Sequence, residues 1–339
     1  LRKLPKRTAS LPSGASPIAN GPTVRPRRLC RHRVLCWPAE HHRPTAGFRL
    51  LASGLCLLAF LTLSLSAADL TEARALIDSK RIPEAKPILE KIAAAEPGNA
   101  DALLLLGRCL ACMGRRDEAM PVLEKAAALQ TSRADILAEL GVVYLEEARL
   151  KNSLSLMRKG RWTIEKALEI DPGNMLAHEG LFGFFSNAPW LVGGSMDKAY
   201  RQALAIREHN PQRGLVLMVG LKNKEKKYAE SFALCHEVLK QTPDDYTALY
   251  EIGLTASLSG ERTDEALVSL EKCFRIIPPP GVPGHAGVHY RIGLILQAKG
   301  AKSKAAEHFA AGLALDPRNE QLLDAQARLK QACGFSPSG

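Results

Sequence analysis

A helical pattern recurs along this chain at a fixed spacing, and the recurrence constrains the fold more than any other feature. Residues 100–133 contain leucines three and four positions apart, then Gly114, then a second apolar stripe. Each stripe predicts an amphipathic helix, and Gly114 can supply the left-handed backbone that ends the first one. Gly107 and Gly141 stand 34 residues apart in matching surroundings. A period of this length predicts stacked helical hairpins.

Further units continue this register towards the C-terminus. The second unit is seven residues longer than the first, which predicts about one more turn on each helix. The third contains an inserted loop, the fourth is degenerate, and the fifth and sixth are regular. Proline cannot continue a helix. The second helices are therefore expected to end at Pro97, Pro172, Pro211, Pro243, Pro278 and Pro317.

Two segments are expected to close the array. Residues 69–99 carry a second-helix pattern, but their first helix lacks the usual glycine, so we interpret them as a partial capping unit. Residues 319–333 predict a final amphipathic helix that covers the last hairpin, because an uncovered repeat exposes its apolar face. The predicted apolar face of this helix consists of Leu322, Leu323, Ala325 and Leu329.

The paired stripes, with Gly107 and Ala119 where two helices cross, resemble the tetratricopeptide repeat family. The resemblance covers the residues from Asp69 to Cys333. It implies an all-α, right-handed superhelix of about six hairpins, with a partial N-terminal unit and a C-terminal capping helix. It also implies that the chain binds a protein or peptide and is not an enzyme. No cofactor is expected.

Between Ala134 and Pro211 the chain is similar to a narrower group of bacterial exported repeat proteins. An extended repeat ending in KALEIDPGN precedes a loop of the form AP-x-x-VGGS. The Gly-Gly-Ser end of the loop precedes a helix, so its backbone N–H groups could bind an anion; the alternative is a sharp turn that caps the helix. The resemblance implies no established activity. The candidate loop residues are Pro189, Trp190, Gly193, Gly194 and Ser195.

The segment before the array is typical of an export signal. Residues 1–49 are rich in Arg, Pro, Ser and Gly, which predicts disorder, and we interpret part of them as an overextended reading frame. Residues 50–68 are uncharged and end in small residues, as a secretory signal does. We expect cleavage after Ala68; the alternative is a retained anchor, because a bilayer span takes about 20 apolar residues. Residues 334–339 are expected to form a disordered tail.

The basic character of the chain lies almost entirely in this leader. Of 46 Lys and Arg and 35 Asp and Glu in the chain, residues 1–50 hold 11 basic residues and one acid. That leaves 35 basic and 34 acidic residues for the rest. A nearly neutral array lacks the basic stripe that nucleic-acid binding needs. Nucleic acid is therefore not expected as a partner, and a membrane is expected only if residues 50–68 are not cleaved.

Two motifs suggest chemistry but are better explained by structure. Cys109 and Cys112 form a CxxC pair, yet it lies within a predicted helix and has no second pair. His285 and His289 are four residues apart, but zinc needs three or four ligands and no third is signalled. We therefore expect buried or partly buried thiols, solvated or structural histidines, and no metal site.

The first helices are expected to line the inner face of the array, as the resemblance implies. Tyr250 and Tyr290 hold equivalent positions in neighbouring repeats and could form steps of an aromatic ladder for a partner; the alternative is that they pack between adjacent helices. The lysine and asparagine clamp that some family members use for a peptide carboxylate is missing. The candidate groove residues are Arg108, Glu146, Asn187, Tyr250, Leu254, Tyr290 and Leu294.

These features together predict a protein-binding or peptide-binding scaffold or adaptor in the cell envelope, exported to the periplasm or cell surface. One alternative is a periplasmic component of a solute-uptake system, with a small ligand bound near Trp190 and the inserted loop. Another is an envelope-assembly factor tethered to the inner membrane by an uncleaved helix at residues 50–68.

Overall fold

The computed structural model describes residues 68–332, and every regular element in this range is a helix. Residues 68–78 are helical and precede α2 (Ile82–Ala95). The leader, the export signal and the tail were predicted for residues that lie outside the described range, in 1–67 and 333–339. Only Ala68, the last residue of the predicted signal, is described, and it is helical.

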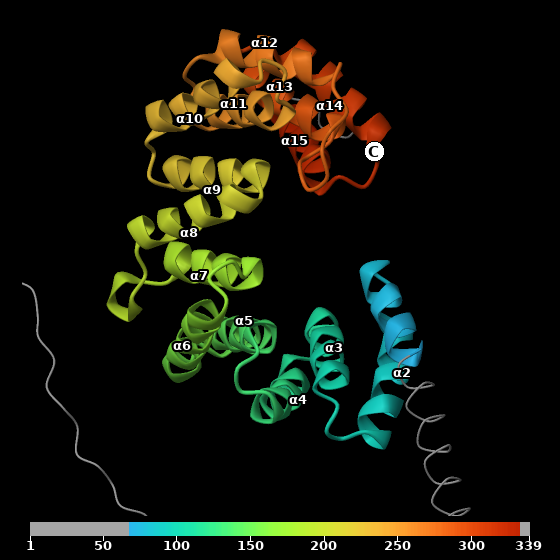
Figure 1. The fold of residues 1–339 in the computed structure, drawn as a ribbon. Helices are drawn as coiled ribbons and strands as arrows, with labels where there is room; N and C mark the ends of the chain where they lie inside the picture. Colours follow the sequence, from blue (N-terminus) through green and yellow to red (C-terminus); the bar gives the residue numbers. More distant parts are fainter. Residues whose placement is uncertain (1–67, 333–339) are drawn as a thin grey trace, which may run out of the picture. The chain divides into compact units, whose positions relative to one another are not determined.

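Six further hairpins follow, each made of a first and a second helix, and Figure 1 shows them stacked in chain order. They are α3 (Ala100–Cys112) with α4 (Arg116–Leu129), α5 (Ala134–Lys151) with α6 (Leu154–Ile170), α7 (Met175–Asn187) with α8 (Met196–His209), α9 (Pro211–Lys224) with α10 (Tyr228–Gln241), α11 (Tyr246–Ser259) with α12 (Thr263–Cys273), and α13 (His285–Ala298) with α14 (Lys302–Leu315).

The predicted all-α, right-handed superhelix is confirmed, and so is the degenerate fourth unit, which forms α9 and α10. The extra residues of the second unit lengthen both of its helices, as expected. Helix α5 has 18 residues against 13 in α3, and α6 has 17 against 14 in α4. At 3.6 residues a turn, this is about one additional turn on each helix.

Glycines on the first helices let the two helices of a hairpin approach closely. A Cβ built at Gly107 would lie within 3.0 Å of the Leu123 side chain, and one at Gly253 would meet Leu270 in the same way. Both leucines are fully buried. The hairpins therefore close because no side chain stands between the helix backbones.

First helices also pack against the first helices of neighbouring hairpins. Helix α5 contacts α3 and α7, and α11 contacts α9 and α13. The second helices form the other layer, and α4 packs against α5 as well as α3. Each hairpin therefore buries one face within itself and another against the next hairpin, as expected of a solenoid.

The C-terminal helix α15 (Glu320–Ala332) packs on α14 and α13, as predicted for a capping helix. Leu322, Ala325 and Leu329 are buried beside Phe309. Leu323, which we expected on the same face, is instead exposed. Its place in the helix, one residue after Leu322, turns it away from the hairpin.

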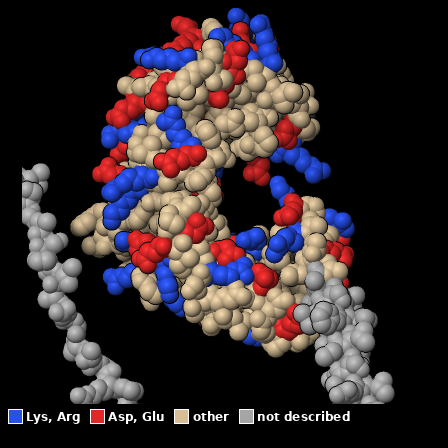
Figure 2. Space-filling view, in the orientation of Figure 1, with Lys and Arg blue, Asp and Glu red and all other residues tan. Residues whose placement is uncertain are grey.

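Charged side chains of both signs are mixed over the face shown in Figure 2. Most ion pairs join neighbouring turns or neighbouring helices, as in Arg115–Glu118 and Arg207–Glu237. Within residues 68–332, no helix combines the length and the apolar character needed to span a bilayer.

Candidate partner-binding surfaces

The inserted loop joins α7 to α8 through a short 3-10 helix, η1 (Trp190–Val192). The backbone N–H of Gly194 donates to the Pro189 carbonyl at 3.1 Å, and that of Ser195 donates to the Phe185 carbonyl at 2.9 Å. The Ser195 hydroxyl accepts from the Lys198 N–H at 3.3 Å and so caps α8. The loop is thus fixed to both helices by its own backbone.

Both glycines of the loop are required by its geometry. Gly193 has φ of 102°, in the left-handed region that favours glycine. A Cβ at Gly194 would overlap the Ala188 carbonyl oxygen. The capping-turn interpretation of the Gly-Gly-Ser segment therefore holds. The anion-binding interpretation is not supported, because the N–H groups of Gly193, Gly194 and Ser195 already donate hydrogen bonds to backbone carbonyls.

The loop presents two large apolar side chains to solvent. Trp190 is 83% exposed and Leu191 is 77% exposed. Pro189, just before them, is also exposed. Trp190 and Leu191, adjacent on a fixed backbone, form the most exposed apolar feature of the third hairpin, the Trp190–Leu191 tip.

The predicted groove residues of the N-terminal half are engaged in polar pairs across hairpins. The Arg108 guanidinium donates to Glu139 at 3.1 Å, and Arg116 Nε lies 2.5 Å from Glu146. The Asn187 side-chain oxygen accepts from Lys224 Nζ at 3.1 Å. These side chains link successive hairpins, so a partner would have to exchange existing contacts to use them.

The aromatic ladder predicted for the C-terminal half is not formed. Tyr250 is only 2% exposed and belongs to the packed core around α11. Arg291 Nε lies 3.4 Å from the Tyr250 hydroxyl, and Gly287 packs so close to Tyr250 that an added Cβ would lie 3.3 Å from the same hydroxyl. The segment that enters α13 covers this tyrosine, so the packing alternative is correct for Tyr250.

Tyr290 remains half-buried, with its ring 6.4 Å from that of Phe309 and with the Arg291 guanidinium 5.1 Å from its centre. Leu254 and Leu294 are half-buried as well. Tyr290, Leu254 and Leu294 thus stay partly accessible, whereas Tyr250 does not.

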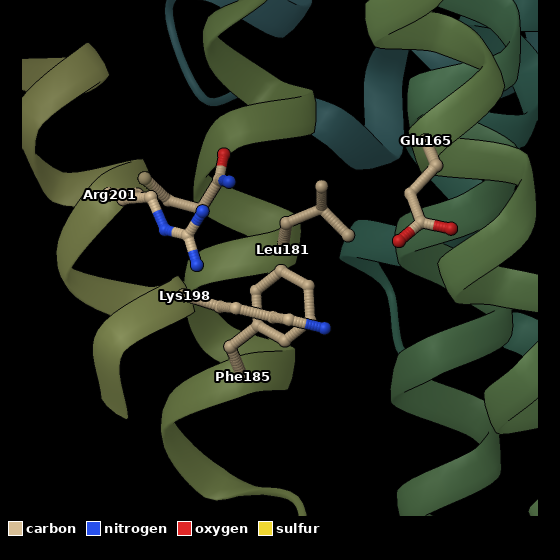
Figure 3. Close-up of a pocket in the computed structure, with 6 residues that line it drawn as sticks. Glu165, Leu181, Phe185, Lys198 and Arg201 are labelled. Atoms are coloured by element: carbon tan, nitrogen blue, oxygen red, sulfur yellow. The ribbon is translucent and has the colours of Figure 1, made fainter. Parts of the chain in front are cut away.

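A cavity of about 260 Å³ lies between α6, α7 and α8, next to the inserted loop. Leu181 and Phe185 form its apolar wall (Figure 3). Lys198 and Arg201 lie on one side of that wall and Glu165 lies on the other, and Lys198 Nζ is 5.5 Å from the centre of the Phe185 ring. Glu165 already pairs with Arg161, whose Nε is 2.8 Å from its carboxylate.

Comparison with known proteins finds a family match over part of the chain and a similar fold over most of it. The tetratricopeptide repeat family model matches residues 76–138, which run from the helix before α2 into α5. The described array has the tetratricopeptide repeat fold. No curated protein matches the sequence.

Several solved structures are similar to the array. A tetratricopeptide repeat protein from Parabacteroides merdae is 18% identical, with 78% of this chain and 98% of that chain covered and a TM-score of 0.55. The C-terminal part of a repeat protein from Cytophaga hutchinsonii is 16% identical, with 76% and 98% covered and a TM-score of 0.49. PilF of Pseudomonas aeruginosa is 19% identical, with 68% and 97% covered and a TM-score of 0.46.

The two cysteines of the CxxC pair differ in exposure, although both were expected to be buried or partly buried. Cys109 is buried and Cys112 is exposed, and both are free. Burial raises the pKa of the Cys109 thiol to about 11 and also raises that of Cys112. A raised pKa suppresses the reactive thiolate, so this pair has none of the activation that redox cysteines need.

The two histidines of α13 point to different partners. His285 Nε2 lies 3.1 Å from the carbonyl oxygens of both Cys273 and Ile276. His289 Nδ1 instead lies 3.1 Å from Nδ1 of His308 on α14. No grouping of metal-ligand residues occurs within residues 68–332.

Two features of the array were missed at the sequence level. One is the cavity beside Lys198 and Arg201, whose walls come from three helices and share no motif. The only available signal was Lys198 and Arg201, two basic residues three positions apart near the start of α8. The other is Glu251, a carboxylate that is only 3% exposed on α11.

Proposed function

We propose that this chain is a non-catalytic scaffold that holds a protein partner through the Trp190–Leu191 tip of its third hairpin. The observation that carries the proposal is the exposure of these two side chains on a backbone fixed by hydrogen bonds. Trp is enriched among residues that dominate binding energy, and a loop that is already ordered avoids much of the entropy cost of binding.

The tetratricopeptide fold supports this proposal, because stacked hairpins present extended surfaces for binding. The proposal extends to the cell envelope, on the strength of the signal-like residues 50–68 and the AP-x-x-VGGS loop. N-terminal sequencing of the mature protein tests this part. A chain that starts at Asp69 fits export with cleavage, whereas a chain that keeps residues 50–68 fits the tethered assembly factor.

A comparative pull-down from the native envelope tests the partner-binding site. The wild-type chain should capture a protein that W190A and L191A capture at least tenfold less, because truncation of a central apolar anchor typically costs about 2 kcal/mol or more. The matched control is I277A, since Ile277 is 90% exposed in another loop. Equal capture by wild-type, W190A and L191A chains would refute the site.

A second variant separates the shape of the loop from its side chains. G194A keeps Trp190 and Leu191 but forces a Cβ against the Ala188 carbonyl, so it should displace the tip. We expect G194A to lose capture while the helical content, measured by circular dichroism, stays close to that of the wild type. G98A is the control, because a Cβ at Gly98 meets nothing within 4 Å.

A further inference from the structure

The cavity between α6, α7 and α8 has the composition of a binding site for a small organic anion. Leu181 and Phe185 form an apolar wall, and the other four lining residues, Glu165, Lys198, Arg201 and Gln202, are polar or charged. Ligand sites are typically apolar with a small number of placed polar groups, and most are larger than about 300 Å³. A cavity of about 260 Å³ therefore suits a single small ligand or one residue of a chain.

The charges around the cavity are unbalanced. Lys198 and Arg201 line it, and Glu165 is the one carboxylate among its lining residues. The Arg161 guanidinium lies 5.5 Å from the centre of the Phe185 ring. Glu165 is already paired with Arg161. Within residues 68–332, neither Lys198 nor Arg201 forms an ion pair with a carboxylate. Two basic groups thus remain beside the apolar wall without an ion pair to any carboxylate of residues 68–332.

A further donor group faces the same space. Gln202 lines the cavity, and its side-chain oxygen lies 2.7 Å from Nδ1 of His178. His178 is held in turn through Nε2, which lies 2.8 Å from the Pro172 carbonyl oxygen. These contacts fix the orientation of the Gln202 amide at the cavity wall. A charged guanidinium can bind a carboxylate with two hydrogen bonds, and a neighbouring ammonium adds attraction.

We propose that this cavity binds a monocarboxylate with an apolar body, whose carboxylate contacts Lys198 and Arg201 while its apolar part packs on Leu181 and Phe185. The ligand can be a free organic acid or an apolar residue at the end of a polypeptide, because both carry a carboxylate next to an apolar group. This site is distinct from the Trp190–Leu191 tip, and its test does not depend on the partner-binding proposal.

Calorimetric titration of the full chain with 3-phenylpropionate tests the site, with the uncharged 3-phenylpropionamide as the matched ligand. We expect the acid to bind at least tenfold more tightly than the amide, and its affinity to fall as salt is added. K198Q and R201Q should each weaken binding of the acid about tenfold, since a hydrogen bond to a charged group is lost. K240Q, at an exposed lysine of α10, should leave binding unchanged.

The same titration with a pentapeptide ending in phenylalanine, with a free or an amidated C-terminus, distinguishes the two sources of the ligand. Tighter binding of the free peptide end than of 3-phenylpropionate assigns the site to a chain end, and the reverse order assigns it to a free acid. The proposal is overturned if acid and amide bind alike, if neither binds, or if K198Q and R201Q, folded by circular dichroism, bind the acid like the wild type.

Discussion

At the scale of single residues, Glu251 is the most unusual group in the array. It is 3% exposed on α11, and burial raises the pKa of its carboxyl group from its ordinary value of 4.5 to about 7, although the positive charge of Arg291 opposes this. The Cys235 thiol of α10 is another titratable group close to it. A carboxyl group with a raised pKa favours the folded state when it is protonated. Its contribution to the free energy of unfolding is therefore complete below pH 4.5 and is lost as the pH rises through 7.

We therefore predict that E251Q stabilises the chain in a pH-dependent way. At pH 8 the wild type keeps an ionised carboxylate in the core, and the neutral amide should raise the free energy of unfolding by about 3 kcal/mol. At pH 5 the gain should fall below about 1 kcal/mol. Urea unfolding at the two pH values measures this gain in the free energy of unfolding, with E208Q, at an exposed site on α8, as the control. An equal gain at both pH values would attribute the effect to packing instead of ionisation.

At the scale of helices, the hairpin depends on glycine at the crossing of its two helices. Gly253 faces Leu270, and three atoms of this leucine would lie within 3.0 Å of an added Cβ. Gly220 lies in α9, where an added Cβ would meet nothing within 4 Å. The two glycines are both helical, so they differ in the space around them and not in their backbone.

G253A and G220A should accordingly change stability in opposite directions. Overpacking against Leu270 should cost about 1–3 kcal/mol, while alanine at the open position should gain up to about 1 kcal/mol because glycine is a poor helix former. Thermal unfolding of the two variants beside the wild type measures both. A G253A chain as stable as the wild type would show that the hairpin tolerates a wider separation of its helices.

The sequence was sufficient to predict the helices and their pairing, including the weak fourth unit, because each hairpin is specified by apolar spacing and turn residues within some 34 positions. It did not predict which first-helix residues stay accessible. Tyr250 is covered because Pro283 and Gly287 fold over α11, where the Pro283 carbonyl accepts from the Tyr246 hydroxyl at 2.7 Å. That contact joins residues of different hairpins, and the repeat register contains no information about it.

The structure of the inserted loop, unlike that of the groove, could be predicted in part from nearby residues. Its glycines and Ser195 are used within the loop itself, so local sequence was enough to predict a sharp, capped turn. The exposure of Trp190 and Leu191 is set by the absence of a neighbouring helix over η1 within residues 68–332, which a local pattern does not encode. The same limit applies to the cavity at Lys198 and Arg201, whose walls come from α6, α7 and α8.

At the scale of the whole array, stability is expected to be local, because each hairpin contacts mainly its neighbours. Helix α15 covers the last hairpin and buries Leu322, Ala325 and Leu329 against the group that includes Phe309. Without this cover, the apolar faces of α13 and α14 would meet water.

We predict that a chain ending at Asn319, which lacks α15, loses amide hydrogen-exchange protection in α13 and α14 but keeps it in α3 and α4. The removed contacts involve the last hairpin alone, and in a solenoid the effect of a lost contact decays with distance along the array. Exchange measured by mass spectrometry resolves the two regions. L323A is the control, because Leu323 lies on the exposed side of the same helix. Uniform loss of protection from α3 to α14 would mean that the array unfolds as one cooperative unit.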